Sequence, residues 1–200
     1  MLALLVTAAL AAAKPYTISA ARKDEAGKWQ RADVLEETRL GVSFEIKFLD
    51  PAGTRSAVKT GLGKDLDLLP GRIDEHKPGF LVFVLQVNNN GQQDVYFNPT
   101  QARLTSDHGD VEFALDYSAL YEVARKLGPD APSLDELATI ALDRAVTIRA
   151  GGSIRKLIAF DAPREDKYHE LEVHLYEVNV GPISMDVVFP FRKFFEKKDG

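Results

Sequence analysis

Apolar and polar residues alternate over several short segments of the chain, and this alternation predicts a mainly β protein. From Leu40 to Asp50, apolar residues occupy every second position, which gives one buried and one solvated face. Turn residues separate further segments of the same kind, at 16–20, 111–115, 146–149, 154–160, 169–179 and 183–191. Strands spaced in this way are typical of a β-sandwich.

The segment at 79–87 differs from the others because both of its faces are apolar. Both faces must therefore be covered, so we expect this strand at the centre of the sandwich. Asn88-Asn89-Asn90-Gly91 follows it, and these residues tolerate positive φ. The sequence predicts a hairpin turn here, leading into a second strand at 95–99. A ligand-binding role for the amides is the alternative.

A helical period of apolar residues lies between 116 and 145. It predicts a first helix that is closed by Gly128-Pro129, because Gly can adopt the left-handed conformation and Pro cannot continue a helix. A second helix is expected to begin at Ser133, where Ser133 and Glu136 match the capping-box pattern. We expect these two helices to form an inserted hairpin (about residues 116–145) that covers one face of the central strand.

Other stretches are less regular. Residues 28–34 could return as the hairpin partner of the strand at 16–20, and residues 30–39 could equally form a short helix. Pro51-Ala52-Gly53 predicts a turn. Residues 54–78 have little apolar periodicity and are expected to form a long connection that crosses between the two sheets.

The composition indicates a globular protein of one domain. The chain has 200 residues, 45% of them hydrophobic, which is enough for a core of its own. A net charge of −5 argues against general nucleic-acid binding. Cysteine is absent, which excludes disulfides and thiolate chemistry.

The apolar run from Met1 to Ala13 resembles the hydrophobic core and cleavage site of a secretory signal peptide. It is too short to span a bilayer as a helix. We therefore expect an exported protein, periplasmic or extracellular, with residues 14–200 as its single β-sandwich domain. A buried N-terminal helix is the alternative for this run.

Two groups of residues resemble the telokin-like, immunoglobulin-like domains of exported bacterial proteins of unknown function. The first group runs from the strand at 79–87 through Asn88–Gly91 and 95–99 to Ala102-Arg103-Leu104 and the turn at 107–110. The second is 149–153 with 157–163. The resemblance covers about residues 79–180. It implies an immunoglobulin-like β-sandwich and a non-enzymatic domain of the cell envelope, and it supplies no catalytic residues.

The polar residues form no catalytic or cofactor-binding pattern. Asp107, His108 and Asp110 could bind a divalent cation, but a polar turn explains the same residues. His169 and His174 are five residues apart, so they point to opposite faces of a regular strand. Two glycine-containing segments, Gly152-Ser153 and Gly61-Leu62-Gly63-Lys64, lack the context of a nucleophile elbow and of a phosphate loop. We assign no catalytic, cofactor-binding or metal residue.

The expected function is therefore a non-enzymatic binding or assembly module of the bacterial cell envelope, with another envelope protein as its partner. The alternative is an enzyme or metal-binding protein that uses the loops at 54–78 and 107–110, where His76 and His108 lie. A third hypothesis is a subunit of a larger envelope complex. In the tail at 191–198, we expect Phe191 to finish the last strand, with docking on a membrane surface or a partner as the alternative.

Overall fold

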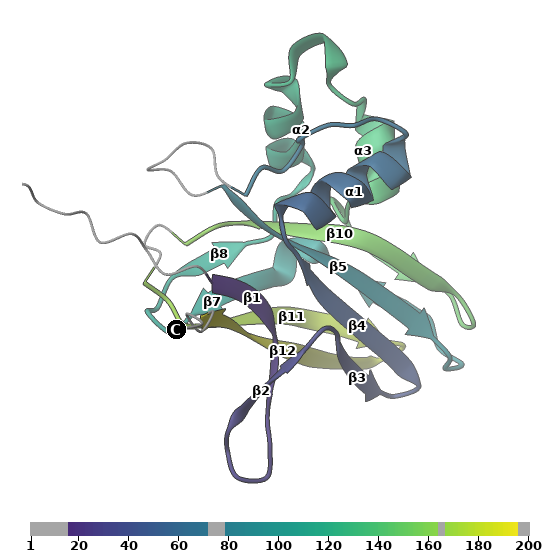
Figure 1. Cartoon of the computed structure of the whole chain (residues 1–200). Coiled ribbons are helices and arrows are strands. Elements are labelled where there is room, and N and C mark those ends of the chain that lie inside the picture. The colour runs from purple at the N-terminus through teal and green to yellow at the C-terminus, as the bar shows by residue number, and fades with distance from the viewer. Residues whose placement is uncertain (1–15, 72–78, 164–166, 196–200) are drawn as a thin grey trace, which may run out of the picture.

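The structure is a computed structural model, and it describes residues 16–71, 79–163 and 167–195. They form two antiparallel β-sheets and three α-helices, so the prediction of a mainly β protein with two packed sheets is confirmed (Figure 1). The apolar run at 1–13, His76 and residues 196–200 lie outside the described residues.

The larger sheet, here called sheet A, has eight strands: β1 (Tyr16–Lys23), β2 (Trp29–Ala32), β6 (Val95–Phe97), β7 (Ala102–Ser106), β8 (Val111–Phe113), β9 (Val146–Ile148), β11 (Glu170–Val180) and β12 (Ile183–Phe195). Its order begins β2-β1-β12-β11. The far side of β11 pairs with both β6 and β7, which pair in turn with β9 and β8. β12 continues past Phe191, where the sequence predicted its end, because its last residues pair with β1.

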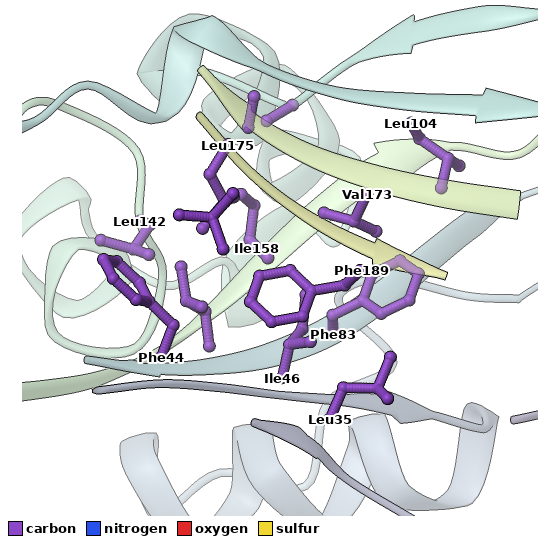
Figure 2. Close-up of a cluster of buried hydrophobic side chains, with 14 of the residues drawn as sticks. Leu35, Phe44, Ile46, Phe83, Leu104, Leu142, Ile158, Val173, Leu175 and Phe189 are labelled. Carbon is purple, nitrogen blue, oxygen red and sulfur yellow. The ribbon is translucent and has the colours of Figure 1, made fainter. Parts of the chain in front are cut away.

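The smaller sheet, sheet B, has the order β10 (Ser153–Asp161), β5 (Phe80–Asn89), β4 (Val42–Leu49) and β3 (Leu35–Arg39). The inner face of β5, with Phe83 and Leu85, packs against sheet A in the main core. Figure 2 shows Phe83 and Ile46 of sheet B close to Phe189 of sheet A in this core. The outer face of β5, with Val82 and Val84, belongs to a second apolar cluster. The prediction that both faces of this strand are covered is confirmed.

Three helices supply the second cover: α1 (Pro51–Leu62), α2 (Tyr117–Arg125) and α3 (Leu134–Ile140). They lie on the side of sheet B that faces away from sheet A (Figure 1). The two predicted helices are present, and the capping box of Ser133 and Glu136 is formed. However, α3 ends at Ile140, before the predicted limit of 145. The next residues run beside β10, where the amide of Leu142 donates to the carbonyl of Leu157 at 2.7 Å.

The prediction of a turn at Pro51-Ala52-Gly53 followed by an irregular connection was wrong, because these residues begin α1. The Asp50 side chain accepts a hydrogen bond from the amide of Gly53 at 2.6 Å, and Pro51 takes a position where no backbone donor is needed. The helix buries Thr54 and Val58, a pattern too sparse for a clear apolar period. The predicted crossing is also absent, since β4 and β5 are direct neighbours in sheet B.

The predicted hairpin after the central strand was wrong as well. β5 belongs to sheet B and β6 to sheet A, so the chain crosses between the sheets at this turn. Asn89 is fully buried there. Its Nδ2 donates to the carbonyls of Gln93 at 2.8 Å and Ile148 at 3.0 Å, and its Oδ1 accepts from the amide of Gly91 at 3.1 Å. The side chain of Asn89, at the end of β5 in sheet B, is therefore hydrogen-bonded to Ile148 in β9 of sheet A.

The structure also tests the predictions for residues 28–39, for Leu40 and for the strand at 111–115. Residues 28–39 contain two strands, β2 and β3, so the hairpin alternative is right and the helix is wrong. Leu40 lies in a turn with φ of 53°, half exposed, so the alternating strand begins at Val42. Val111 and Phe113 do form a strand, but their side chains are exposed.

Candidate functional site

Sheet A has one face without a covering layer in the described part of the chain. Its inner face packs on sheet B, and all three helices lie beyond sheet B (Figure 1). We call the outer side of sheet A the open face. Large apolar side chains are exposed on it: Tyr96, Val111, Phe113 and Val188. Exposed apolar side chains that gather on one surface mark sites of interaction.

The strand period decides which side chains reach the open face. On β11, Leu171, Val173 and Leu175 point into the core, so Glu170, Glu172 and His174 point outward. Pairing places His174 directly opposite Arg103 of β7, and Arg103 directly opposite Phe113 of β8. Directly opposed side chains on one face of a sheet are close enough to interact.

Four of these side chains form a stack, here called the Arg103 cluster: His174, Tyr176, Arg103 and Phe113. The His174 and Tyr176 rings are parallel within 7°, with centroids 5.4 Å apart. The Arg103 guanidinium carbon lies 5.1 Å from the centroid of Tyr176 and 5.1 Å from that of Phe113. Cation–π contacts on two sides restrict the position of the guanidinium.

A β-bulge on β11 lies beside Tyr176, which points outward because its neighbour Leu175 is in the core. The register of β11 against β12 shifts between Leu175 and Val178, and Glu177 has φ of 53°. The side chain of Asp186 stabilises the bulge by accepting a hydrogen bond from the amide of Glu177 at 3.0 Å. Bulges are known to redirect side chains, and a non-glycine residue with positive φ is uncommon in a strand.

The polar contacts of the Arg103 cluster leave the guanidinium without a carboxylate partner among the described residues. Nε2 of His174 lies 3.0 Å from Oε2 of Glu172 and 3.2 Å from Oγ1 of Thr105, so the nearby carboxylate pairs with the imidazole. Nε of Arg103 is buried and has no hydrogen-bond partner. A buried donor without a partner costs about 1–3 kcal/mol in stability. Because the described hydrogen bonds do not offset this cost, we attribute the position of the guanidinium to its contacts with the two rings.

A second group of side chains, the Trp29 cluster, lies at the other end of the open face. The indole Nε1 of Trp29 donates to Oε1 of Glu170 at 3.1 Å, and Arg192 forms an ion pair with the same oxygen at 3.1 Å. Lys23 and Arg192 lie over the indole, at 4.8 and 5.4 Å from the ring centroid. To reach Glu170 from the edge strand β2, the indole must cross β1 and β12. Ala21 of β1, which points to the same face, has no exposed surface.

The outward row of β11 joins the two clusters. Glu170 belongs to the Trp29 cluster, His174 and Tyr176 belong to the Arg103 cluster, and Glu172 lies between them. Six residues of strand span about 20 Å. Tyr96 extends the row further, because it pairs with Asn179 of β11. The open face therefore presents an extended line of rings and charges.

The residues that the sequence offered as a cation site build a turn instead. Asp107 accepts hydrogen bonds from the amide of His169 at 3.0 and 3.2 Å, and Asp110 accepts one from Oγ of Ser106 at 3.0 Å. His108 is exposed. Within the described ranges, no three His, Cys, Asp or Glu side chains are placed to share a metal ion. His169 packs against Phe195 by its ring, at 5.8 Å.

The two glycine-containing segments also have structural roles. Gly61, Leu62 and Gly63 end α1, and Gly63 takes the left-handed conformation of a helix terminus with φ of 68°. Gly152 donates to the carbonyl of Arg149 at 2.8 Å in the turn between β9 and β10, which lie in different sheets.

The resolved pKa shifts belong to turns and helix ends. Gln30 and the amide of Lys28 lower the pKa of Asp24 by hydrogen bonding. Lys64, and then the amide of Ser133, lower the pKa of Glu136 to about 2. Asp143 raises the pKa of Arg144 by hydrogen bonding. Catalytic groups combine shifted pKa values with a cleft, whereas these three shifts follow from local hydrogen bonds at the surface.

A shallow cleft of about 390 Å³ lies on the opposite side of the molecule, between α1, α3 and the outer face of sheet B. Its floor is apolar, with Leu49, Val84 and Leu157, and its rim carries hydroxyl groups and Arg155. Its lining contains no carboxylate and no imidazole; the charged side chains are those of Arg155 and Lys156, and Nζ of Lys156 donates to the carbonyl of Ala138.

No sequence pattern assigned Arg103, Tyr176, Phe113 or Trp29 to a site. One signal was present for Arg103 and His174, because each lies between two apolar residues on an alternating strand and so points outward. The pairing that brings them together is a long-range property of the fold.

The described ranges contain no helix that is long and apolar enough to cross a membrane. No family model matches the chain, and no curated protein is similar to it in sequence. Among solved structures, the yjhA protein from Bacillus subtilis is similar with a TM-score of 0.41 and 8% identity, over 77% of this chain and 93% of that chain. A functionally unknown protein from Listeria monocytogenes EGD-e has a TM-score of 0.38 and 11% identity, over 90% and 88%.

Proposed function

We propose that this protein is a non-catalytic module that binds a polysaccharide of the bacterial cell envelope on the open face of sheet A. The observation that carries the proposal is the line of rings and charges from Trp29 to Tyr96, on a sheet face that no described element covers. Flat apolar ring faces can pack against the flat apolar side of a sugar ring, and the polar groups between them can bond to hydroxyls.

The geometry of the open face favours recognition by side chains over the addition of a strand. A peptide that binds by adding a strand needs the free backbone groups of a sheet edge. On the face of a sheet those groups are already paired, so binding energy must come from side chains. The side chains here are a row of rings with charged groups between them, spread over about 20 Å rather than gathered in a pocket.

Three further features support a binding module over an enzyme. Among the candidates named from the sequence, Asp107 lies in a turn and Ser153 is the first residue of strand β10. The resolved pKa shifts follow from surface hydrogen bonds. The cleft beside α1 lacks an acid–base pair among its lining residues.

The immunoglobulin-like fold and the export of the protein are part of the same proposal. Two antiparallel sheets around a shared core are what an immunoglobulin-like sandwich requires. Two of the three helices on sheet B, α2 and α3, lie within the range 116–145 of the expected insertion, whereas α1 lies outside it. Export is supported by the apolar run at 1–13, and it would bring the open face to envelope polysaccharides.

Affinity electrophoresis tests the binding. The wild-type protein is run through gels that contain a series of soluble bacterial and plant polysaccharides, neutral and acidic. We expect at least one polysaccharide to retard it, and Phe113→Ala to weaken that retardation about five- to tenfold, as for a ring contact of about 1–1.5 kcal/mol. Tyr121→Ala is the matched control, because Tyr121 is an exposed ring on α2, beyond sheet B.

Two results would contradict the proposal. One is that no polysaccharide in the series retards the wild-type protein. The other is that Tyr121→Ala weakens the retardation as much as Phe113→Ala does, which would place the ligand away from the open face. Circular dichroism and the melting temperature of each variant show whether its fold is intact.

A further inference from the structure

We infer that the Arg103 cluster is a carboxylate-binding subsite, so that the open face selects acidic polysaccharides, those whose sugars carry a carboxylate group. This inference rests on the proposed function and names the ligand class of the same surface. It is carried by the combination of a restrained guanidinium, a neighbouring imidazole and the absence of a carboxylate partner for that guanidinium among the described residues.

The restraint comes from both neighbouring strands. Phe113 on β8 and Tyr176 on β11 each contact the Arg103 guanidinium, with its central carbon 5.1 Å from either ring centroid. Tyr176 is itself fixed by the stacked ring of His174. An arginine normally loses much side-chain freedom when it binds a ligand. Here the rings have already restricted that freedom, so less is lost when an anion arrives.

The available donors of Arg103 suit a carboxylate. Nε is buried and has no partner, so a ligand must use the two terminal nitrogens. Two terminal N–H groups side by side match the two oxygens of a carboxylate, and such paired, charge-assisted hydrogen bonds are among the strongest in proteins. The exposed ring of Phe113, 56% accessible, lies next to this edge. A sugar that carries the carboxylate could pack its ring there.

The charges on the open face agree with an anionic ligand. Glu170 is already bonded to Trp29 and Arg192, and Glu172 lies against His174. These carboxylates therefore have cationic or donor partners. Arg31, at the β2 edge, donates to Oγ1 of Thr17 at 2.6 Å and lies over the Phe194 ring. Like Arg103, it has no carboxylate partner in the described ranges, so the face offers two cationic groups to an anion.

Nuclear magnetic resonance tests the subsite with small probes. Sodium glucuronate is titrated into the ¹⁵N-labelled full chain, with glucose and inorganic phosphate as parallel probes at the same ionic strength. We expect glucuronate to shift the Nε–H resonance of Arg103 and the amides of Phe113 and Tyr176 in a saturable way. Glucose at the same concentration should leave the Nε–H resonance unchanged, and phosphate should bind at least threefold more weakly than glucuronate.

Two substitutions and a control complete the test. Arg103→Gln should abolish the saturable shift, and Arg103→Lys should weaken it about tenfold, because an ammonium group cannot make the paired contact. Arg155→Gln is the control, since Arg155 is an exposed arginine on the other side of the molecule, and it should bind glucuronate like the wild type. In gels, Arg103→Gln should weaken retardation by an acidic polysaccharide at least tenfold.

The outcomes separate the two proposals. If the protein binds neutral and acidic polysaccharides equally and Arg103→Gln changes neither, the carboxylate subsite is refuted and the polysaccharide-binding function stands. If glucuronate binds at Arg103 but no polysaccharide retards the protein, the subsite stands and the proposed function is refuted. If phosphate binds as tightly as glucuronate, a general oxyanion site replaces the carboxylate site.

Discussion

Replacing Asn89 tests how the two sheets are connected. The side chain is fully buried at the point where the chain passes from β5 in sheet B to β6 in sheet A. It donates to the carbonyls of Gln93 and Ile148 and accepts from the amide of Gly91. Asn89→Ala removes all three hydrogen bonds and leaves two carbonyls and one amide without their partner.

The expected loss follows from these contacts. A hydrogen bond contributes about 1 kcal/mol net to stability, and a buried group that loses its partner costs about 1–3 kcal/mol. Three bonds therefore give a loss of about 3–5 kcal/mol in the free energy of unfolding. With a urea dependence of about 2 kcal/mol per molar, the unfolding midpoint should fall by about 1.5–2.5 M. Urea denaturation followed by circular dichroism measures this shift.

Two further variants sharpen the test. Asn89→Asp keeps the size and the acceptor but faces both carbonyls with a carboxylate, so it should be at least as destabilising as Asn89→Ala. Asn90→Ala is the matched control. It removes an exposed asparagine next in the chain, and its effect should stay within about 0.5 kcal/mol. A loss below about 1 kcal/mol for Asn89→Ala would refute the role given to this side chain.

Two other predictions concern the helices. Gly61→Ala should destabilise the protein by about 1–3 kcal/mol, because a Cβ at this position would lie 2.2 Å from Cγ2 of Ile140. The double variant with Ile140→Ala should lose less than the sum of the single losses, and additive losses in urea denaturation would contradict the close packing of α1 on α3. Lys64 and Ser133 lower the pKa of Glu136 from 4.5 to about 2. The ionised carboxylate therefore stabilises the folded protein above pH 4.5, and this stabilisation is lost as the pH falls towards 2. The difference in unfolding midpoint between the wild type and Glu136→Gln should therefore shrink over that range, and a constant difference would contradict the assignment.

Local signals in the sequence predicted several elements correctly. The central strand stood out because both of its faces are apolar, and the main core and the helices provide the two covers. The capping box at Ser133 depends on residues only three positions apart, so it was visible without the fold. In contrast, α1 was missed, because its buried positions are few and the signals at its ends, Asp50, Pro51 and Gly63, are the same residues that make turns.

Long-range pairing explains the remaining differences. Asn-Gly forms a tight turn whether the next strand joins the same sheet or the opposite one, so the crossing at Asn89 could not be predicted from the turn residues. A strand was predicted at 111–115 and is present at 111–113, but which face it presents depends on its pairing with β7. The Arg103 cluster combines residues of three strands, and only their register brings the rings to the guanidinium.

If the ligand lies on the open face of sheet A, it must contact the outward side chains of that sheet. Chemical-shift mapping tests this location most directly, with an oligosaccharide prepared from a polysaccharide that retards the protein. We predict that the shifted amides cluster on β7, β8, β11 and β12, around Arg103 and Trp29. Shifts that cluster instead on α1, α3 and β10, around the cleft near Arg155, would contradict the account.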